Sequence, residues 1–173
     1  MIFWVRAMRF NRSGVEAYRV LMRFAEEAYK LCLDYVRYGN EMDEMFLDLA
    51  ERNRHLIKYS SGIRRRIERM KRDILDRSRD RFEMLVLGYW WMHKYLLYKA
   101  VLTVLKYQSE VTLQQALNIA DKWFIEEVSR SKGRDYAERF LMLAYEYELN
   151  KAREKNIQLH PYFIKKAKRM GVR

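Results

Sequence analysis

The basic residues between Gly62 and Phe82 are the part of the chain best suited to chemistry with phosphates. This segment holds nine basic side chains against four acidic ones. Lys and Arg side chains neutralise phosphates and release the counterions that surround a nucleic acid. We therefore predict a nucleic-acid-binding helix here. Its basic residues are Arg64, Arg65, Arg66, Arg69, Lys71, Arg72, Arg77, Arg79 and Arg81.

Helical spacing divides this segment into a buried face and a cationic face. At the 100° rotation of an α-helix, one stripe is apolar and consists of Ile63, Ile67, Met70 and Ile74. The opposite side carries Arg65, Arg69, Arg72 and Arg79. Such a row of arginines can follow a DNA backbone without reading bases. The alternative is a solvated face whose arginines pair with acidic neighbours in the same helix.

The net charge of +12 is concentrated in three zones. Residues 1–14 carry +3, residues 62–82 carry +5 and residues 151–173 carry +7, whereas the two segments between them are nearly neutral. Charge that only keeps a protein soluble would not segregate in this way, whereas a surface that tracks phosphates would. The first and last zones add Arg6, Arg9, Arg12, Lys165, Lys166, Lys168 and Arg169 to the predicted binding residues. An ordinary basic protein with solvated Lys and Arg is the alternative.

The residues typical of enzymes and metal sites do not occur in useful arrangements. One cysteine and three scattered histidines are too few for a standard zinc site, and no glycine-rich phosphate loop is present. We predict a solvated helix face, rather than a nuclease site, for Asp121, Glu126, Glu127 and Lys132. His93 reads as a core histidine. We expect no catalytic residue, cofactor, metal or small-molecule substrate.

The chain reads as an all-α protein, a helical bundle of about five to seven helices. The first predicted helix begins after Ser13 and ends at Gly39, and the second runs from Asn40 to Gly62. The arginine-rich segment follows as the next helix. The later predicted helices span 84–107, 113–132, 135–156 and 161–170. Thr112, Asp135 and His160 mark three of the starts. We divide the chain into an N-terminal arm over residues 1–12, a bundle over 13–156 and a basic C-terminal helix over 157–173.

The segment 84–107 is apolar almost all round and long enough to suggest a membrane span. His93, Lys94, Lys99 and Lys106 interrupt it, however, and ionisable residues inside a bilayer are costly. We therefore predict the central helix of a bundle. Cys32 reads as a packing residue, and a chain with one cysteine and no signal peptide is expected to remain inside the cell.

The N-terminal arm combines aromatic and basic residues. Phe3, Trp4 and Phe10 lie among its three arginines, ahead of the first predicted helix. We expect these aromatic side chains to pack on a neighbouring subunit, because the arm offers no helical face of its own on which to bury them. The cationic helix is expected to bind DNA more strongly than residues 157–173, since a flexible tail must first be ordered.

Taken together, these features resemble the nucleocapsid (major capsid) proteins of filamentous viruses of hyperthermophilic archaea. The resemblance is one of overall character: a basic all-helical chain, few Asn, Gln, Ser and Thr residues, an arm, and a cationic helix beside an apolar one. It implies dimers of like subunits that wrap double-stranded DNA, held in the A form, in a helical filament. The 64–81 helix and the arm would then face DNA in the virion; otherwise we expect a cytoplasmic protein.

Two other functions fit the same features. The chain is also similar to small helical subunits of archaeal RNA-guided interference complexes, which contact nucleic-acid backbones. A scaffold whose basic faces meet acidic proteins is the third possibility. Assembly separates the three, because only a nucleocapsid protein should polymerise on duplex DNA of any sequence.

Overall fold

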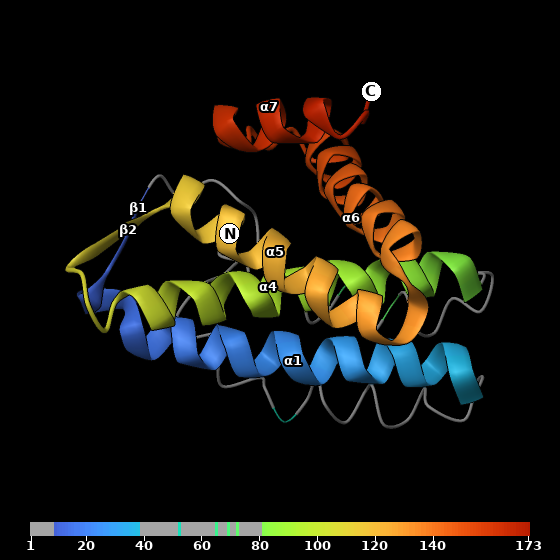
Figure 1. The fold of residues 1–173 in the computed structure, drawn as a ribbon, viewed down its shortest axis with the longest axis horizontal. Coiled ribbons are helices and arrows are strands. Elements are labelled where there is room, and N and C mark those ends of the chain that lie inside the picture. Colours follow the sequence, from blue (N-terminus) through green and yellow to red (C-terminus); the bar gives the residue numbers. More distant parts are fainter. Residues whose placement is uncertain (1–8, 39–51, 53–64, 66–68, 70–71, 73–80) are drawn as a thin grey trace.

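The structure is a computed structural model that describes residues 9–38, 52, 65, 69, 72 and 81–173 of the chain. Five helices pack together beside a two-stranded sheet, which confirms the predicted all-α class (Figure 1). Arg52, Arg65, Arg69 and Arg72 have helical backbone. The elements are β1 (Arg9–Asn11), a 3-10 turn (Arg12–Gly14), α1 (Val15–Tyr38), α4 (Arg81–Val104), β2 (Glu110–Thr112), α5 (Leu113–Lys132), α6 (Arg134–Glu154) and α7 (Pro161–Arg169).

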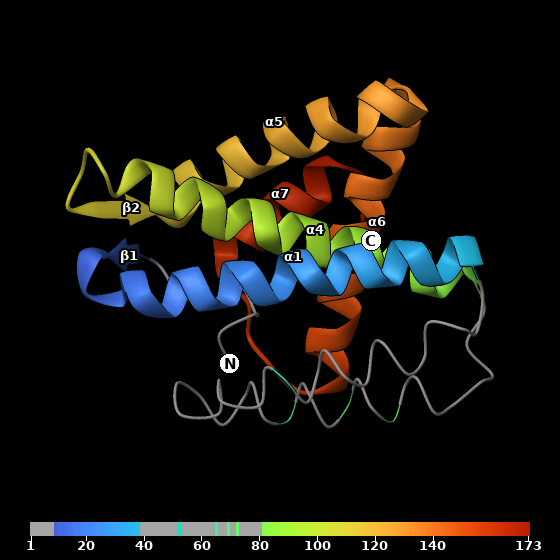
Figure 2. The same ribbon diagram turned by 90° about the horizontal axis from the view of Figure 1, so that it is seen from below.

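The antiparallel pair α1 and α4 forms the base of the fold, and α5, α6 and α7 cover the other side of α4 (Figures 1 and 2). Gly88 of α4 lies directly against Cys32 and Leu33 of α1. A Cβ atom there would stand 3.0 Å from Cys32 Cβ and 3.0 Å from Leu33 Cδ2, so a larger residue would push α1 and α4 apart. Cys32 is buried at this contact, as predicted.

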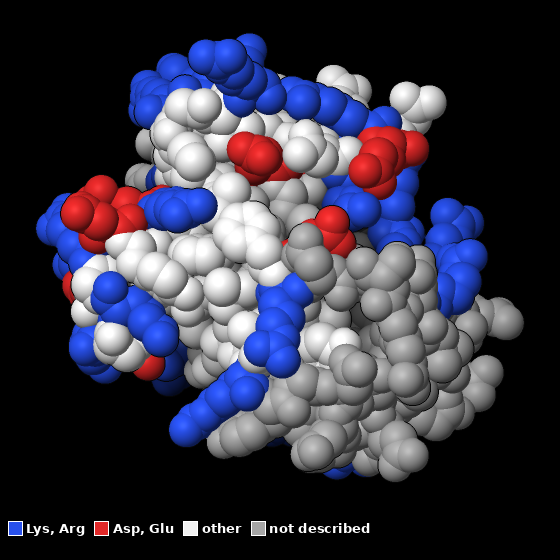
Figure 3. All heavy atoms as spheres, turned by 90° about the vertical axis from the view of Figure 1, so that its right-hand side faces the viewer, with Lys and Arg blue, Asp and Glu red and all other residues white. Residues whose placement is uncertain are grey.

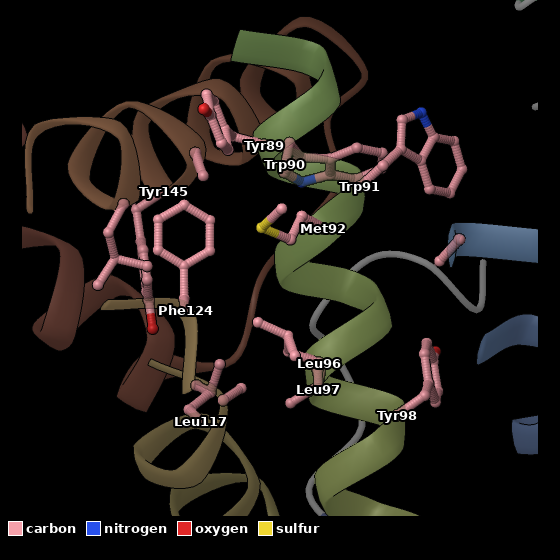
Figure 4. Close-up of a cluster of buried hydrophobic side chains, with 14 of the residues drawn as sticks. Tyr89, Trp90, Trp91, Met92, Leu96, Leu97, Tyr98, Leu117, Phe124 and Tyr145 are labelled. Carbon is pink, nitrogen blue, oxygen red and sulfur yellow. The ribbon is translucent and has the colours of Figure 1, made fainter. Parts of the chain in front are cut away.

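Helix α4 is the centre of the hydrophobic core, as its sequence predicts. Trp90 and Trp91 are both buried, and their ring centroids lie 4.7 Å apart (Figure 4). Trp91 also packs edge-on against Phe24 of α1. Tyr89 packs against Phe124 of α5. No helix in the described part of the chain has the length and apolarity that a membrane crossing requires.

Helix starts follow local sequence signals in some places and not in others. The predicted capping box at Thr112 is present, and His160 caps α7 with Pro161 in the first helical position. The prediction that Asp135 caps α6 is wrong: α6 begins at Arg134, after Gly133, whose backbone has a φ of 89°. Before α1, Asn11 rather than Ser13 supplies the cap, and it caps the 3-10 turn.

The structure corrects part of the prediction for the N-terminal arm. Residues Arg9–Asn11 form β1, which pairs antiparallel with β2 and places Phe10 opposite Val111. Phe10 is buried inside the chain's own core, with its ring edge-on to Tyr18 and Tyr98. Phe10 therefore needs no neighbouring subunit to cover it. Phe3 and Trp4 lie outside the described residues.

The basic C-terminal segment is a packed helix rather than a flexible tail. Phe163 and Ala167 of α7 are buried, and so are Leu159 before the helix and Val172 after it. The premise that these charges must first be ordered is therefore wrong. Removing residues 157–173 would also remove part of the core. The predicted helix 40–61 and the continuation of the arginine-rich helix into α4 lie outside the described residues.

Replacing Phe10→Ala is expected to lower the free energy of unfolding by about 3 kcal/mol, because the change leaves a cavity between Tyr18 and Tyr98. Urea denaturation followed by circular dichroism measures this loss. The matched control is Phe82→Ala at a phenylalanine that is 47% exposed, where a smaller loss is expected. Equal losses in the two variants would show that Phe10 contributes no more than a surface residue.

Candidate nucleic-acid interface

The structure describes ten of the sixteen predicted binding residues. Arg65, Arg72 and Arg81 are exposed, whereas Arg69 is half-buried. Arg9 is exposed and pairs with Glu110 across the small sheet, at 3.1 Å. Arg12, Lys165, Lys168 and Arg169 are exposed, and Lys166 is directed inward. The predicted residues outside the described part are Arg6, Arg64, Arg66, Lys71, Arg77 and Arg79.

A cationic groove of about 660 Å³ lies between the N-terminal half of α1 and the C-terminal half of α4. Its floor and walls include the apolar side chains of Val15, Met22, Leu102 and Leu105. Five exposed basic residues line it, and none of the described residues that line it is acidic. The five are Arg12, Arg19, Arg23, Lys99 and Lys106.

Local contacts hold three of these five cations in place. Arg12 Nε donates to the Leu105 carbonyl at 3.1 Å, which ties the 3-10 turn to the end of α4 and fixes one guanidinium at the groove. Arg19 pairs with Glu16 one turn earlier, at 2.8 Å, in an exposed contact of the kind that contributes little to stability. The Lys99 ammonium lies 5.7 Å from the ring centres of both Tyr95 and Trp123.

Sequence analysis missed four of the five groove residues. Arg19 and Arg23 belong to a segment whose net charge is slightly negative, and Lys99 and Lys106 were considered only as interruptions of an apolar helix. The available signal was spacing, since positions four or seven residues apart share a helix face. Spacing does not show which faces of α1 and α4 meet, so the groove itself was not predictable.

A second cationic surface lies on α7, at the edge of the molecule opposite α1 (Figure 1). Lys and Arg side chains run along this upper edge in Figure 3. Lys165, Lys168 and Arg169 of this surface border an apolar hollow of about 560 Å³ that also includes Leu159 and Ile164. The two cationic surfaces therefore lie on separate faces of the bundle.

Lys166 differs from its neighbours because it enters a buried polar cluster centred on Asp121. Its ammonium lies 2.8 Å from Asp121 Oδ2 and 2.6 Å from Asn118 Oδ1. His93 Nε2 lies 2.7 Å from Asp121 Oδ1, and the Tyr145 hydroxyl donates to the same carboxylate. These contacts leave Lys166 only 15% exposed, so its charge neutralises Asp121 rather than the solvent-facing surface of α7.

This cluster corrects the prediction for Asp121 and confirms the one for His93. Asp121 lies on the buried side of α5, whereas Glu126, Glu127 and Lys132 are exposed as predicted. Burial alone would raise the pKa of the Asp121 carboxyl, but the hydrogen bonds and charges of His93 and Lys166 outweigh it and lower that pKa. Burial, followed by the charge of Asp121, raises the pKa of the Tyr145 phenol, which therefore remains a donor.

A second buried pair lies beside this cluster. Lys94 of α4 and Glu148 of α6 are fully buried and form an ion pair. The Lys94 ammonium also lies 5.5 Å from the Trp90 ring centre and 5.6 Å from that of Phe163. A buried charge requires such compensation, and the pair joins α4 to α6 while α7 covers it.

The polar cluster and the groove differ in what they can do chemically. The cluster is largely buried and internally neutralised, which suits a structural role. Among the described residues, no three His, Cys, Asp or Glu side chains gather in a way that would hold a metal ion. The groove is open and carries a net positive charge, although Arg19 also pairs with Glu16, and this charge suits an extended polyanion. The chain matches no protein-family model, no curated protein and no solved structure.

The lowered pKa of Asp121 predicts a pH-dependent effect of Asp121→Asn. A carboxylate with a depressed pKa stabilises the fold at neutral pH, and this contribution is lost as the pH falls through the folded-state pKa. We expect the variant to be about 3 kcal/mol less stable than the wild type at neutral pH. The difference should shrink as the pH falls below about 4. Denaturant titrations at several pH values measure it, and a difference independent of pH would contradict the ion-pair role.

Proposed function

We propose that the protein is a structural DNA-binding subunit that coats double-stranded DNA by its backbone, without reading the base sequence. The cationic groove between α1 and α4 carries this proposal, because it presents five exposed cations, and the part of its lining that the structure describes includes no acidic residue. Neutralising phosphates requires this supply of charge along an extended surface. No catalytic residue, cofactor or small-molecule substrate enters the proposal.

The shape of the groove supports backbone binding over base readout. Base-reading helices insert a convex surface into the major groove of DNA, where side chains reach the base edges. Here α1 and α4 lie side by side and form a concave surface instead. A sugar-phosphate strand is the part of a duplex that fits a concave cationic surface. The apolar residues of the groove support the aliphatic stems of its Arg and Lys side chains.

Two further observations favour coating by many subunits. Arg65 and Arg72 are exposed and lie in helical backbone, seven residues apart, as expected for a face that meets phosphates. The α7 surface adds three exposed cations at the opposite edge of the molecule. A subunit with cations on separate faces can contact DNA on more than one side. We therefore propose assembly with like subunits on duplex DNA, as in the nucleocapsid of a virion.

Neutralising two groove cations tests the proposal. The double variant Arg19→Gln with Arg23→Gln should bind duplex DNA about tenfold more weakly at moderate salt, since two phosphate contacts are lost. The log–log slope of affinity against salt should change from roughly −4.5, for five contacts at −0.9 each, to about −2.7 for three. Fluorescence anisotropy with two unrelated labelled duplexes measures both quantities.

The matched control removes the same charge from α6. Arg134 and Arg139 are exposed, and Arg139 lies beside Asp135 and Glu138 rather than in a cationic groove. Replacing both by Gln should leave the salt slope close to that of the wild type. The proposal fails if the control weakens binding as much as the groove variant does, or if wild-type affinity does not depend on salt.

A further inference from the structure

A second hollow, with aromatic walls, adjoins the cationic groove. Its volume is about 400 Å³, within the range of small-ligand pockets, and α1, α4 and α5 all contribute to it. Buried Met92 and Leu96 form its floor. Half-buried Tyr29, Tyr95 and Trp123 form its walls. We refer to these residues, with the charged rim described below, as the aromatic pocket.

The rim of the aromatic pocket is charged but balanced. The positive charges of Lys99 and Arg130 balance the negative charges of Glu126 and Glu127. Arg130 Nη1 pairs with Glu127 Oε2 at 3.2 Å. Within the described residues, Glu126 has no ionic partner. A pocket that combines aromatic side chains with a mainly polar, charge-balanced exposed lining suits a flat ligand with polar edges. Glu126 supplies a free acceptor for N–H donors on such an edge.

Lys99 connects the aromatic pocket to the cationic groove because it lines both. Its ammonium lies 5.7 Å from each of the Tyr95 and Trp123 ring centres, so it occupies the space in front of both rings. The side chain is exposed and also borders the groove. A planar ligand that stacks on these rings would displace the ammonium toward an anion in the groove.

We propose that the aromatic pocket binds an unpaired nucleobase of a DNA strand whose phosphates lie in the cationic groove. This inference rests on the proposed function for its phosphate contacts and adds a site for single-stranded ends or gaps. The base would stack on Trp123 and Tyr95, and Glu126 would accept a hydrogen bond from a base amino group. Stacking on aromatic side chains is the general means of holding unpaired bases. Adenine and cytosine carry such amino groups and thymine does not.

Binding of short single-stranded oligonucleotides, measured beside a duplex of the same length, tests the pocket. Trp123→Leu should weaken binding of oligo(dA) by about tenfold, as expected for the loss of one stacked base, and should leave duplex affinity unchanged. The control is Tyr107→Leu, at an aromatic residue that is 84% exposed and outside the pocket, and it should change neither affinity. Thermal unfolding by circular dichroism checks that Trp123→Leu remains folded.

A second variant keeps the test decisive if Trp123→Leu does not fold. Glu126 is exposed, so Glu126→Gln is compatible with the fold. Wild-type protein should bind oligo(dA) and oligo(dC) several-fold more tightly than oligo(dT), and Glu126→Gln should narrow this preference. The inference is overturned if Trp123→Leu weakens duplex and single-strand binding equally, if it weakens neither, or if the wild type shows no preference against oligo(dT).

The two proposals fail in different ways. Wild-type protein that does not bind duplex DNA would overturn the proposed function whatever the oligonucleotides show. Duplex binding that depends on Arg19 and Arg23, together with single-strand binding that does not depend on Trp123, would overturn only the aromatic pocket.

Discussion

Burying the ion pair between Lys94 and Glu148 constrains how the helices of this protein pack. A charge inside an apolar core is tolerated only when an oppositely charged group contacts it. Helices α4 and α6 must therefore cross where these two side chains meet. Asp121 imposes a similar requirement nearby, because His93, Tyr145 and Lys166 must all reach it. These contacts join α4, α5, α6 and α7. Their shared requirement fixes α7 on the bundle and leaves its remaining cations facing solvent.

The cationic groove depends on a different set of contacts, on the other side of α4. Gly88 allows α1 and α4 to pack closely at Cys32 and Leu33, and the pairing of β1 with β2 brings the start of α1 to the end of α4. The bond from Arg12 to the Leu105 carbonyl then completes one end of the groove. The function proposed here therefore rests on helix packing. If α1 and α4 did not lie side by side, the same cations would form an ordinary basic surface without a shaped site.

Local signals in the sequence predicted the class of fold and several helix starts, because a capping residue such as Thr112 acts within one turn. They did not predict β2, since three residues are too few to show an alternating pattern. Nor did they predict the burial of Asp121, whose partners come from α4, α6 and α7. The aromatic pocket was missed for the same reason. Its three rings are far apart in sequence and meet only after α1, α4 and α5 have packed.

The central claim is that many subunits coat duplex DNA through backbone contacts, and electron microscopy of the protein mixed with long duplex DNA tests it most directly. Two DNA molecules of unrelated sequence and equal length should both become uniformly covered filaments of the same diameter at low salt. Raising the salt concentration should release the bare duplex, since phosphate contacts dominate the affinity. Isolated particles at a few positions, filaments on only one of the two sequences, or naked DNA at low salt would contradict the account.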